Sequence, residues 1–96
     1  MAEYGETVES LESVNNDAFL TIQPPVGEEW EIFNIQHGGA AELYKYDGTN
    51  EVLIDTDSSG GAWASFKFFA TNGNYMRVKN TSGAAAIMGY EGVRIK

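Results

Sequence analysis

The chain of 96 residues has no cysteine, a single histidine and only two prolines. Without cysteine it can form no disulfide framework, no thiolate zinc site and no cysteine nucleophile. A metal site built on imidazole needs a second histidine or a cysteine beside His37, and the sequence supplies neither. No apolar run approaches the roughly 18 residues that a membrane-spanning helix requires.

Positive charge is also scarce. Six Lys and Arg residues stand against fourteen Asp and Glu, which gives a formal net charge of −8. Nucleic acids and anionic membranes are both bound through cationic side chains, so we expect neither as a partner. The charge is unevenly spread, since residues 1–17 carry five acids and no base, whereas residues 67–96 carry five bases and one acid. An acidic face of one molecule can therefore meet a basic face of its neighbour, although a solvated acidic surface is the simpler interpretation.

The chain is rich in glycine-containing turn motifs that separate runs of β-branched and aromatic residues. Short strands separated by turns at intervals of roughly 8–12 residues are typical of antiparallel sandwiches and barrels. We therefore predict an all-β fold, an antiparallel β-sandwich or jelly-roll-like barrel of about eight short strands. The predicted strands cover residues 18–23, 30–37, 41–46, 51–55, 62–70, 75–80, 84–90 and 93–95, with a turn at Glu91-Gly92 between the last two.

Two of the predicted strands carry large apolar side chains on both faces. Strict alternation in residues 30–37 places Trp30 and Ile32 opposite Phe33 and Ile35. The strand predicted for residues 62–70 has the same two-sided character. A single thin sandwich cannot bury both faces, so either a loop or the N-terminal arm covers one of them or that face meets another chain. Single exposed aromatic residues are also common on ordinary protein surfaces. The candidate contact residues in the domain are Trp30, Phe33, Trp63 and Phe69.

The first 17 residues differ in kind from the rest of the chain. They are acidic, and they show neither the basic nor the apolar segment of a secretory signal. We divide the chain into an extended acidic N-terminal arm, residues 1–17, and a β-sandwich domain, residues 18–96. If the arm formed a helix, it would have only about three turns and would be marginally stable by itself. The arm is therefore either a frayed terminus or a segment ordered by a neighbouring molecule. Its candidate contact residues are Tyr4, Val8, Leu11 and Val14.

Candidate catalytic and metal-binding residues are few. His37 lies in no motif that marks a nucleophile, so its interpretation as a general base is weak. The stretch from Asp55 to Gly60 resembles the opening of a calcium-binding loop, but Phe66 occupies the position of the bidentate glutamate. We therefore expect no enzyme, no catalytic residue, no bound metal and no cofactor.

Residues 19–96 resemble small β-rich virion proteins of tailed bacteriophages, and most of all the capsid decoration, or cement, proteins. The stretches that carry the resemblance are LTIQPP at 20–25, GEEW at 27–30, YDGTNE at 46–51, GAW at 61–63, YMRVKNTSG at 75–83 and GYEGV at 89–93. The likeness is one of overall pattern, without a catalytic motif, and it leaves out the arm.

This resemblance implies a jelly-roll-like domain that binds the major capsid protein and clamps neighbouring capsid subunits together. It implies self-association as a homodimer or homotrimer, and a place on the outer capsid surface of a virion assembled in the host cytoplasm. It carries over no active-site residues.

Two alternatives remain open at this stage. The first is a carbohydrate- or receptor-binding β-sandwich module of a phage tail, since aromatic side chains can stack on sugar rings. That function predicts exposed, coplanar rings among the candidates Trp30, Trp63, Tyr44, Tyr46, Tyr75 and Tyr90. The second is a structural protein of the tail or neck.

Overall fold

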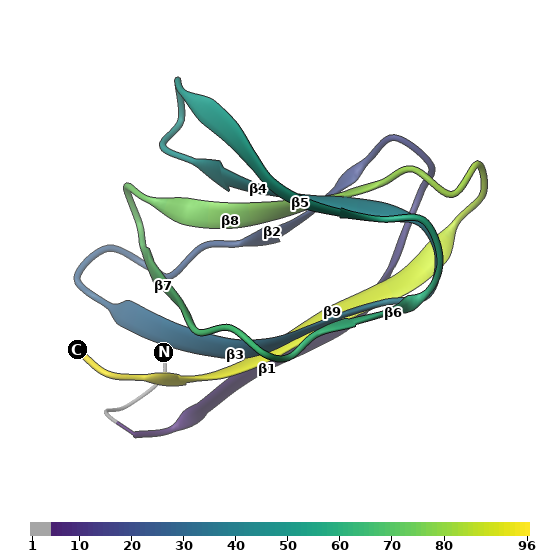
Figure 1. Cartoon of the computed structure of the whole chain (residues 1–96). Helices are drawn as coiled ribbons and strands as arrows, with labels where there is room; N and C mark the ends of the chain where they lie inside the picture. The colour runs from purple at the N-terminus through teal and green to yellow at the C-terminus, as the bar shows by residue number, and fades with distance from the viewer. Residues whose placement is uncertain (1–4) are drawn as a thin grey trace.

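The computed structural model describes residues 5–96, and their regular structure consists of β-strands (Figure 1). The strands are β1 (Thr7–Val14), β2 (Phe19–Ile22), β3 (Glu29–His37), β4 (Ala41–Tyr46), β5 (Glu51–Asp57), β6 (Gly61–Trp63), β7 (Phe68–Thr71), β8 (Tyr75–Asn80) and β9 (Ala86–Arg94). The predicted all-β class is confirmed. Among residues 5–96, no helix has the length and apolar character that a membrane crossing requires.

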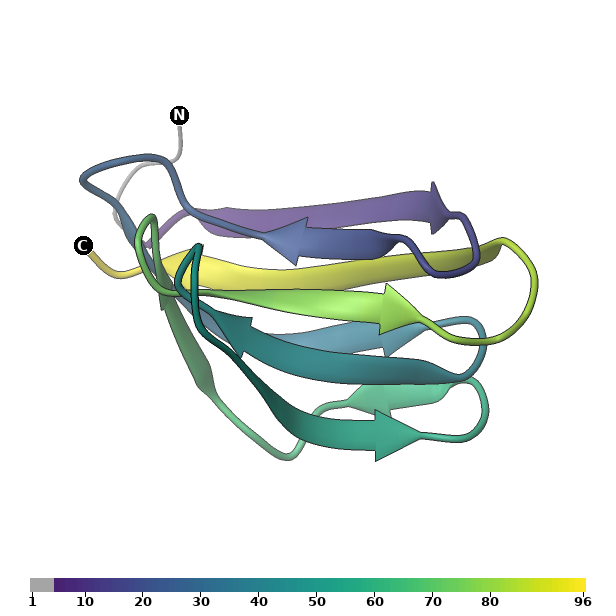
Figure 2. The ribbon, with the colours of Figure 1, turned by 90° about the horizontal axis from the view of Figure 1, so that it is seen from above.

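The strands form two antiparallel sheets, one above the other (Figures 1 and 2). The first sheet has five strands, in the order β1-β9-β3-β6, with β7 also paired to β3. The second has four, in the order β2-β8-β4-β5. The core lies between the sheets, where the largest fully buried apolar side chains are Leu20, Ile22, Ile32, Ile35, Leu43, Met76, Val78 and Met88.

A β-bulge in β3 resolves its apparent excess of apolar residues. The register with β9 shifts between Ile32 and Asn34. A bulge inserts one extra residue and so changes which face the following residues use. Ile35 is therefore buried on the same side as Ile32, and Phe33 is exposed. The prediction that Phe33 and Ile35 share a face is wrong, because it assumed unbroken alternation.

Trp30 lies in the interior of this chain rather than at a contact with another. Its indole Nε1 donates a hydrogen bond to Glu28 Oε1 at 3.0 Å, and its ring stacks on that of Tyr90 with 6.2 Å between the centroids. Burial of the apolar ring together with a partner for its N–H satisfies both parts of the side chain. The prediction of Trp30 as a contact residue is corrected accordingly.

The strand predicted for residues 62–70 is divided into β6 and β7 by an irregular segment at residues 64–67. Trp63 points inward and is buried, so its prediction as an intermolecular contact is also corrected. Phe69 is paired with Glu31 across β7 and β3, and it is exposed on the side away from the core. The break explains why one continuous alternation pattern assigned these faces poorly.

Strand β9 is continuous where the sequence predicted a turn at Glu91-Gly92. Gly92 lies between β1 and β3, and a Cβ atom built on it would collide with the carbonyl oxygen of Glu31. Glycine within a strand often marks such a close approach of another backbone. The glycine is required here by close packing and not by a turn.

The N-terminal segment is part of the sheet, which corrects the prediction of a separate arm for most of its length. All eight residues of β1 pair with β9, from Thr7 opposite Val93 to Val14 opposite Ala86. Val8 and Val14 are buried in the core of this chain, whereas Leu11 is exposed. Only two apolar residues face inward, so the sequence carries little strand signal and backbone pairing with β9 determines the structure. Tyr4 lies outside the described residues.

Candidate interaction surfaces

The first surface is the side of the five-stranded sheet that faces away from the core, here called the outer face. In one row across it lie Leu11, Gly89 and Gln36, at paired positions of β1, β9 and β3. Three of the predicted contact residues share this face with a fourth apolar side chain that the sequence did not single out. They are Leu11, Phe33, Phe69 and Ile87, whose exposed fractions are 71%, 40%, 55% and 52%.

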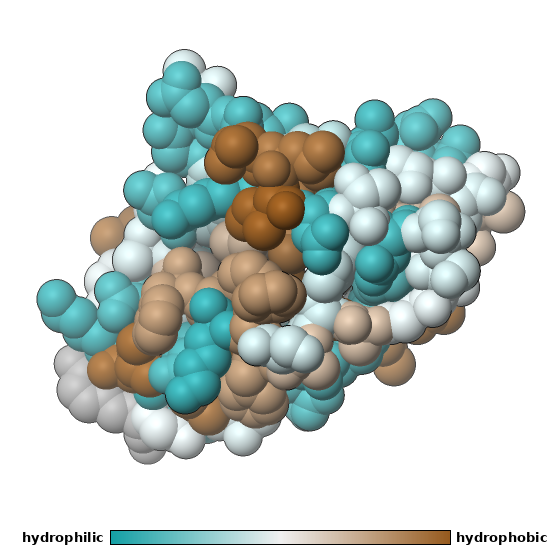
Figure 3. Space-filling model, viewed as in Figure 1, coloured by the Kyte–Doolittle hydropathy of each residue, from teal (hydrophilic) through white to brown (hydrophobic). Residues whose placement is uncertain are grey.

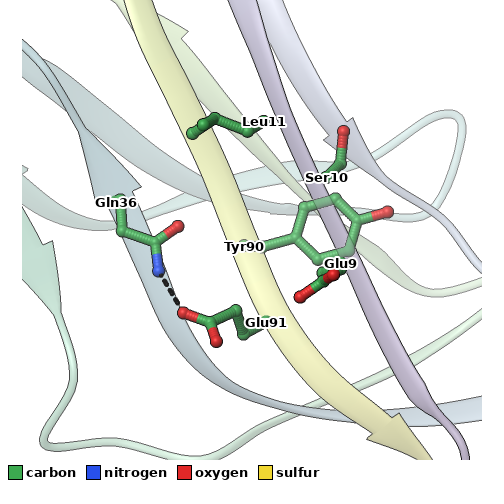
Figure 4. A pocket seen from close by; sticks show the side chains of 6 residues that line it. All are labelled: Glu9, Ser10, Leu11, Gln36, Tyr90 and Glu91. Carbon is green, nitrogen blue, oxygen red and sulfur yellow. Dashed lines mark hydrogen bonds between the residues drawn. The ribbon is translucent and has the colours of Figure 1, made fainter.

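A shallow cavity of about 520 Å³ opens on the outer face above Gly89. Its lining residues are Glu9, Ser10, Leu11, Gln36, Tyr90 and Glu91 (Figure 4). Figure 4 shows Leu11 reaching from β1 across β9. A Cβ atom on Gly89 would lie 2.9 Å from Leu11 Cδ1, so the missing side chain makes room for this arrangement.

The cavity is bordered by carboxylates. Glu9 and Glu91 are directly opposite each other on β1 and β9. Like charges at paired positions of neighbouring strands are destabilising. The Gln36 amide donates to Glu91 Oε1 at 2.8 Å and to Asn34 Oδ1 at 2.7 Å, which orients Glu91 but brings no positive charge. The electrostatics of this part of the outer face therefore favour a cation.

Lys67 lies near the opposite margin of the same sheet, just before β7. Its side chain is 71% exposed, and its Nζ lies 3.8 Å from Glu31 Oε1. The side chain of Phe69, on the same face of β7, is exposed. The outer face thus combines an acidic margin on β1 and β9 with a basic, aromatic margin at β7.

The second surface is the free edge of β5, here called the β5 edge. β5 is paired with β4 on one side, and no strand of the described chain lies on its other side. Three consecutive apolar residues, Val52, Leu53 and Ile54, are exposed by 59%, 48% and 43%. Figure 3 shows apolar side chains gathered over this strand and continuing below it over β6 and β7. The sequence places these apolar residues on both faces of the strand predicted for residues 51–55, which indicates an unusual environment but does not show that the strand lies at an edge.

A smaller cavity of about 180 Å³ adjoins the β5 edge. Its lining residues are Leu43, Ile54, Asp55, Trp63, Phe66 and Phe68, which come from both sheets. Trp63 Nε1 donates to Asp55 Oδ2 at 2.9 Å and so ties β6 to β5. An apolar side chain that entered from outside would lie against rings already held in place.

His37 stabilises the same end of the molecule. Its Nε2 lies 2.8 Å from Asp57 Oδ2, its Nδ1 lies 3.0 Å from the carbonyl oxygen of Gly39, and its ring packs 4.5 Å from that of Trp63. The side chain is fully buried. These contacts give the residue a structural explanation that connects β3, β5 and β6.

Aromatic residues gather on the solvent side of the four-stranded sheet, around Arg77. The guanidinium carbon lies 4.0 Å from the ring centroid of Phe19 and 3.9 Å from that of Tyr46. Phe19 meets Tyr44 at an interplanar angle of 63°, and Tyr46 meets Tyr75 at 87°. The cation thus covers the rings that a sugar would stack on, and neither pair is coplanar.

The titration of Tyr44 provides a test of this aromatic face. Its phenol donates to Glu42 Oε1 at 2.7 Å, and this hydrogen bond is the main cause that raises the pKa of Tyr44 from 10.0 to about 12. The folded state holds the neutral phenol more strongly than the unfolded chain does, so this contribution to stability is complete below pH 10 and is lost as the pH rises to about 12. We expect Glu42→Gln to lower the pKa of Tyr44 in an NMR titration, and Glu9→Gln on the other sheet to leave it unchanged. Equal titration curves in the two variants would contradict the assignment.

No family model matches the chain, and no curated protein is detectably similar to it in sequence. Within residues 5–96, no group of three or more His, Cys, Asp and Glu side chains is placed to hold a metal ion. The strand topology and the two surfaces are therefore the features of residues 5–96 that bear on function.

Proposed function

We propose that this chain is a structural virion protein of the capsid decoration, or cement, type. It binds the major capsid protein on the outer surface of a phage head, bridges neighbouring subunits, and associates with further copies of itself. The observation that carries the proposal is the β5 edge, where three adjacent apolar residues are exposed beside unpaired backbone.

The strand topology supports a jelly-roll fold, an architecture used by viral capsid proteins and lectins. With β6 and β7 counted as one interrupted strand, residues 5–96 form eight strands. Successive strands alternate between the two sheets, except for the hairpin of β4 and β5 in the second sheet. The resulting sheet orders interleave early and late strands, as expected when two Greek keys wrap around one core.

The β5 edge is suited to receive an extended segment of the capsid protein. An exposed sheet edge binds such a segment through main-chain hydrogen bonds, while adjacent pockets select its side chains. Natural proteins usually protect apolar edges with charge, proline or a bulge because unprotected edges pair with other chains. β5 has a register shift opposite Leu43 and Tyr44 and acids at Glu51 and Asp55, but its central residues remain exposed. The 180 Å³ cavity beside Ile54 offers a place for one apolar side chain of the segment. Because a capsid presents many equivalent sites, each contact can be weak and the whole layer still stable.

The experiment is cosedimentation of the purified chain with undecorated heads of the phage it belongs to. We expect Leu53→Lys to lower the affinity for heads by at least about tenfold, because a charge on an edge strand opposes further pairing. Val26→Lys is the matched control, since Val26 is also an exposed apolar residue but lies in a loop. Both variants are checked for native folding by circular dichroism. Equal occupancy of the heads by the two folded variants would overturn the proposal.

A further inference from the structure

The outer face of the five-stranded sheet is a second interaction surface, separate from the β5 edge. Its two margins are complementary: Glu9 and Glu91 border the cavity over β9, and Lys67, whose Nζ lies 3.8 Å from Glu31 Oε1 of its own chain, stands beside the exposed ring of Phe69 at β7. The sheet order places β3 between these margins. The acidic margin of one molecule can therefore contact the basic margin of a second molecule, and the second molecule can make the same contact in return.

We propose that a second copy of this chain covers the outer face, with Lys67 of each copy reaching Glu9 and Glu91 of the other. A two-fold axis passing near β3 brings the β7 margin of one molecule over the β1 margin of its partner. Such an interface is isologous, so each charge contact occurs twice. A lysine ammonium placed between Glu9 and Glu91 relieves the repulsion between their paired positions.

The size and chemistry of the face suit this partner. The molecule extends 37 × 26 × 22 Å, and the broad side of the sheet is of the order needed to bury about 800 Å² per subunit, the usual area for a specific complex. The contact covers all four exposed apolar side chains of the outer face, Leu11, Phe33, Phe69 and Ile87. The cavity above Gly89 receives side chains from the opposing β7 margin.

This inference deepens the self-association in the proposed function and rests on it, but it concerns a different surface from the shell contact. The charges of the outer face also determine which partner fits it. If the partner were an unrelated basic protein, the exposed Lys67 would repel it, whereas a second copy uses both margins at once. The reciprocal use of Lys67 thus favours a second copy of this chain over an unrelated basic protein.

The test is sedimentation velocity of the whole chain over a range of concentrations. We expect a reversible dimer, weakened at least about tenfold by Lys67→Glu and by Glu9→Lys, and restored to within about threefold of the original affinity in the double variant. Lys45→Glu is the matched control, because it changes the net charge by the same amount at an exposed position on the other sheet. We expect this control to remain as dimeric as the original chain.

Three results would overturn the inference: a monomer at all concentrations, equal effects of Lys67→Glu and Lys45→Glu, or no recovery in the double variant. A trimer would also overturn the two-fold arrangement. Head binding is measured in parallel with the Leu53→Lys variant. A chain that dimerises but does not bind heads contradicts the proposed function. A chain that binds heads but does not dimerise contradicts only the two-fold contact through the outer face.

Discussion

Replacing Gly92 by alanine is expected to prevent stable folding. Gly92 lies in the middle strand of three, with Val8 of β1 on one side and Ile32 of β3 on the other. A Cβ atom there would collide with the carbonyl oxygen of Glu31 and lie 2.8 Å from Ile32 Cδ1. The obstacle is backbone held by two ladders of hydrogen bonds, so it cannot move aside as a flexible side chain can. We expect a loss of about 4 kcal/mol or more in the free energy of unfolding, which is a large part of the stability of a small domain.

The measurement is urea denaturation followed by circular dichroism, together with the yield of soluble protein. Gly73→Ala is the control, because nothing lies within 4 Å of a Cβ atom built on Gly73. We expect this control to change the free energy of unfolding by no more than about 0.5 kcal/mol. A Gly92→Ala protein that unfolds at the same urea concentration as Gly73→Ala would show that β9 is packed less tightly than described.

The second large effect is expected at Asn80, a fully buried polar side chain at the end of β8. Its Nδ2 donates to the carbonyl oxygens of Val14 and Ala84, each at 2.8 Å. Its Oδ1 accepts from the backbone N–H of Ser82 at 2.9 Å. One amide thus connects the end of β1 to the turn between β8 and β9. We expect Asn80→Ala to lower the free energy of unfolding by about 3 kcal/mol, because it leaves buried groups without partners.

An isosteric variant separates hydrogen bonding from packing. Asn80→Asp keeps the size of the side chain but removes the donor to Val14 and Ala84, so we expect it to destabilise the protein at least as much as Asn80→Ala does at neutral pH. Asn74→Ala, at an exposed turn position, serves as the control. If Asn80→Asp were as stable as the original chain in urea denaturation, the donor bonds would not have the assigned role.

The sequence predicted the strands best where alternation is regular. The ranges 41–46 and 75–80 coincide with β4 and β8, in which buried and half-buried positions alternate along most of the strand. Prediction failed where a long-range partner decides the structure. The bulge at Phe33, the glycine within β9 and the strand character of residues 7–14 all depend on neighbouring strands that local patterns do not reveal.

The interaction surfaces were predicted in part. Leu11, Phe33 and Phe69 were chosen as contact residues from apolar patterning, and the structure brings all three to the outer face. Trp30 and Trp63 were chosen for the same reason but are buried, since size and apolarity do not distinguish a core residue from a contact residue. The β5 edge was missed because whether a strand is central or at an edge follows from the order of the strands.

The proposed function assigns the contact with the capsid protein to the β5 edge. A cryo-EM map of decorated heads tests it most directly, because it shows the path of every strand at the contact. The account predicts density for an extended segment of the capsid protein alongside β5, with one apolar side chain in the cavity beside Ile54. A map in which the chain is attached through other residues, with β5 facing solvent, would contradict it.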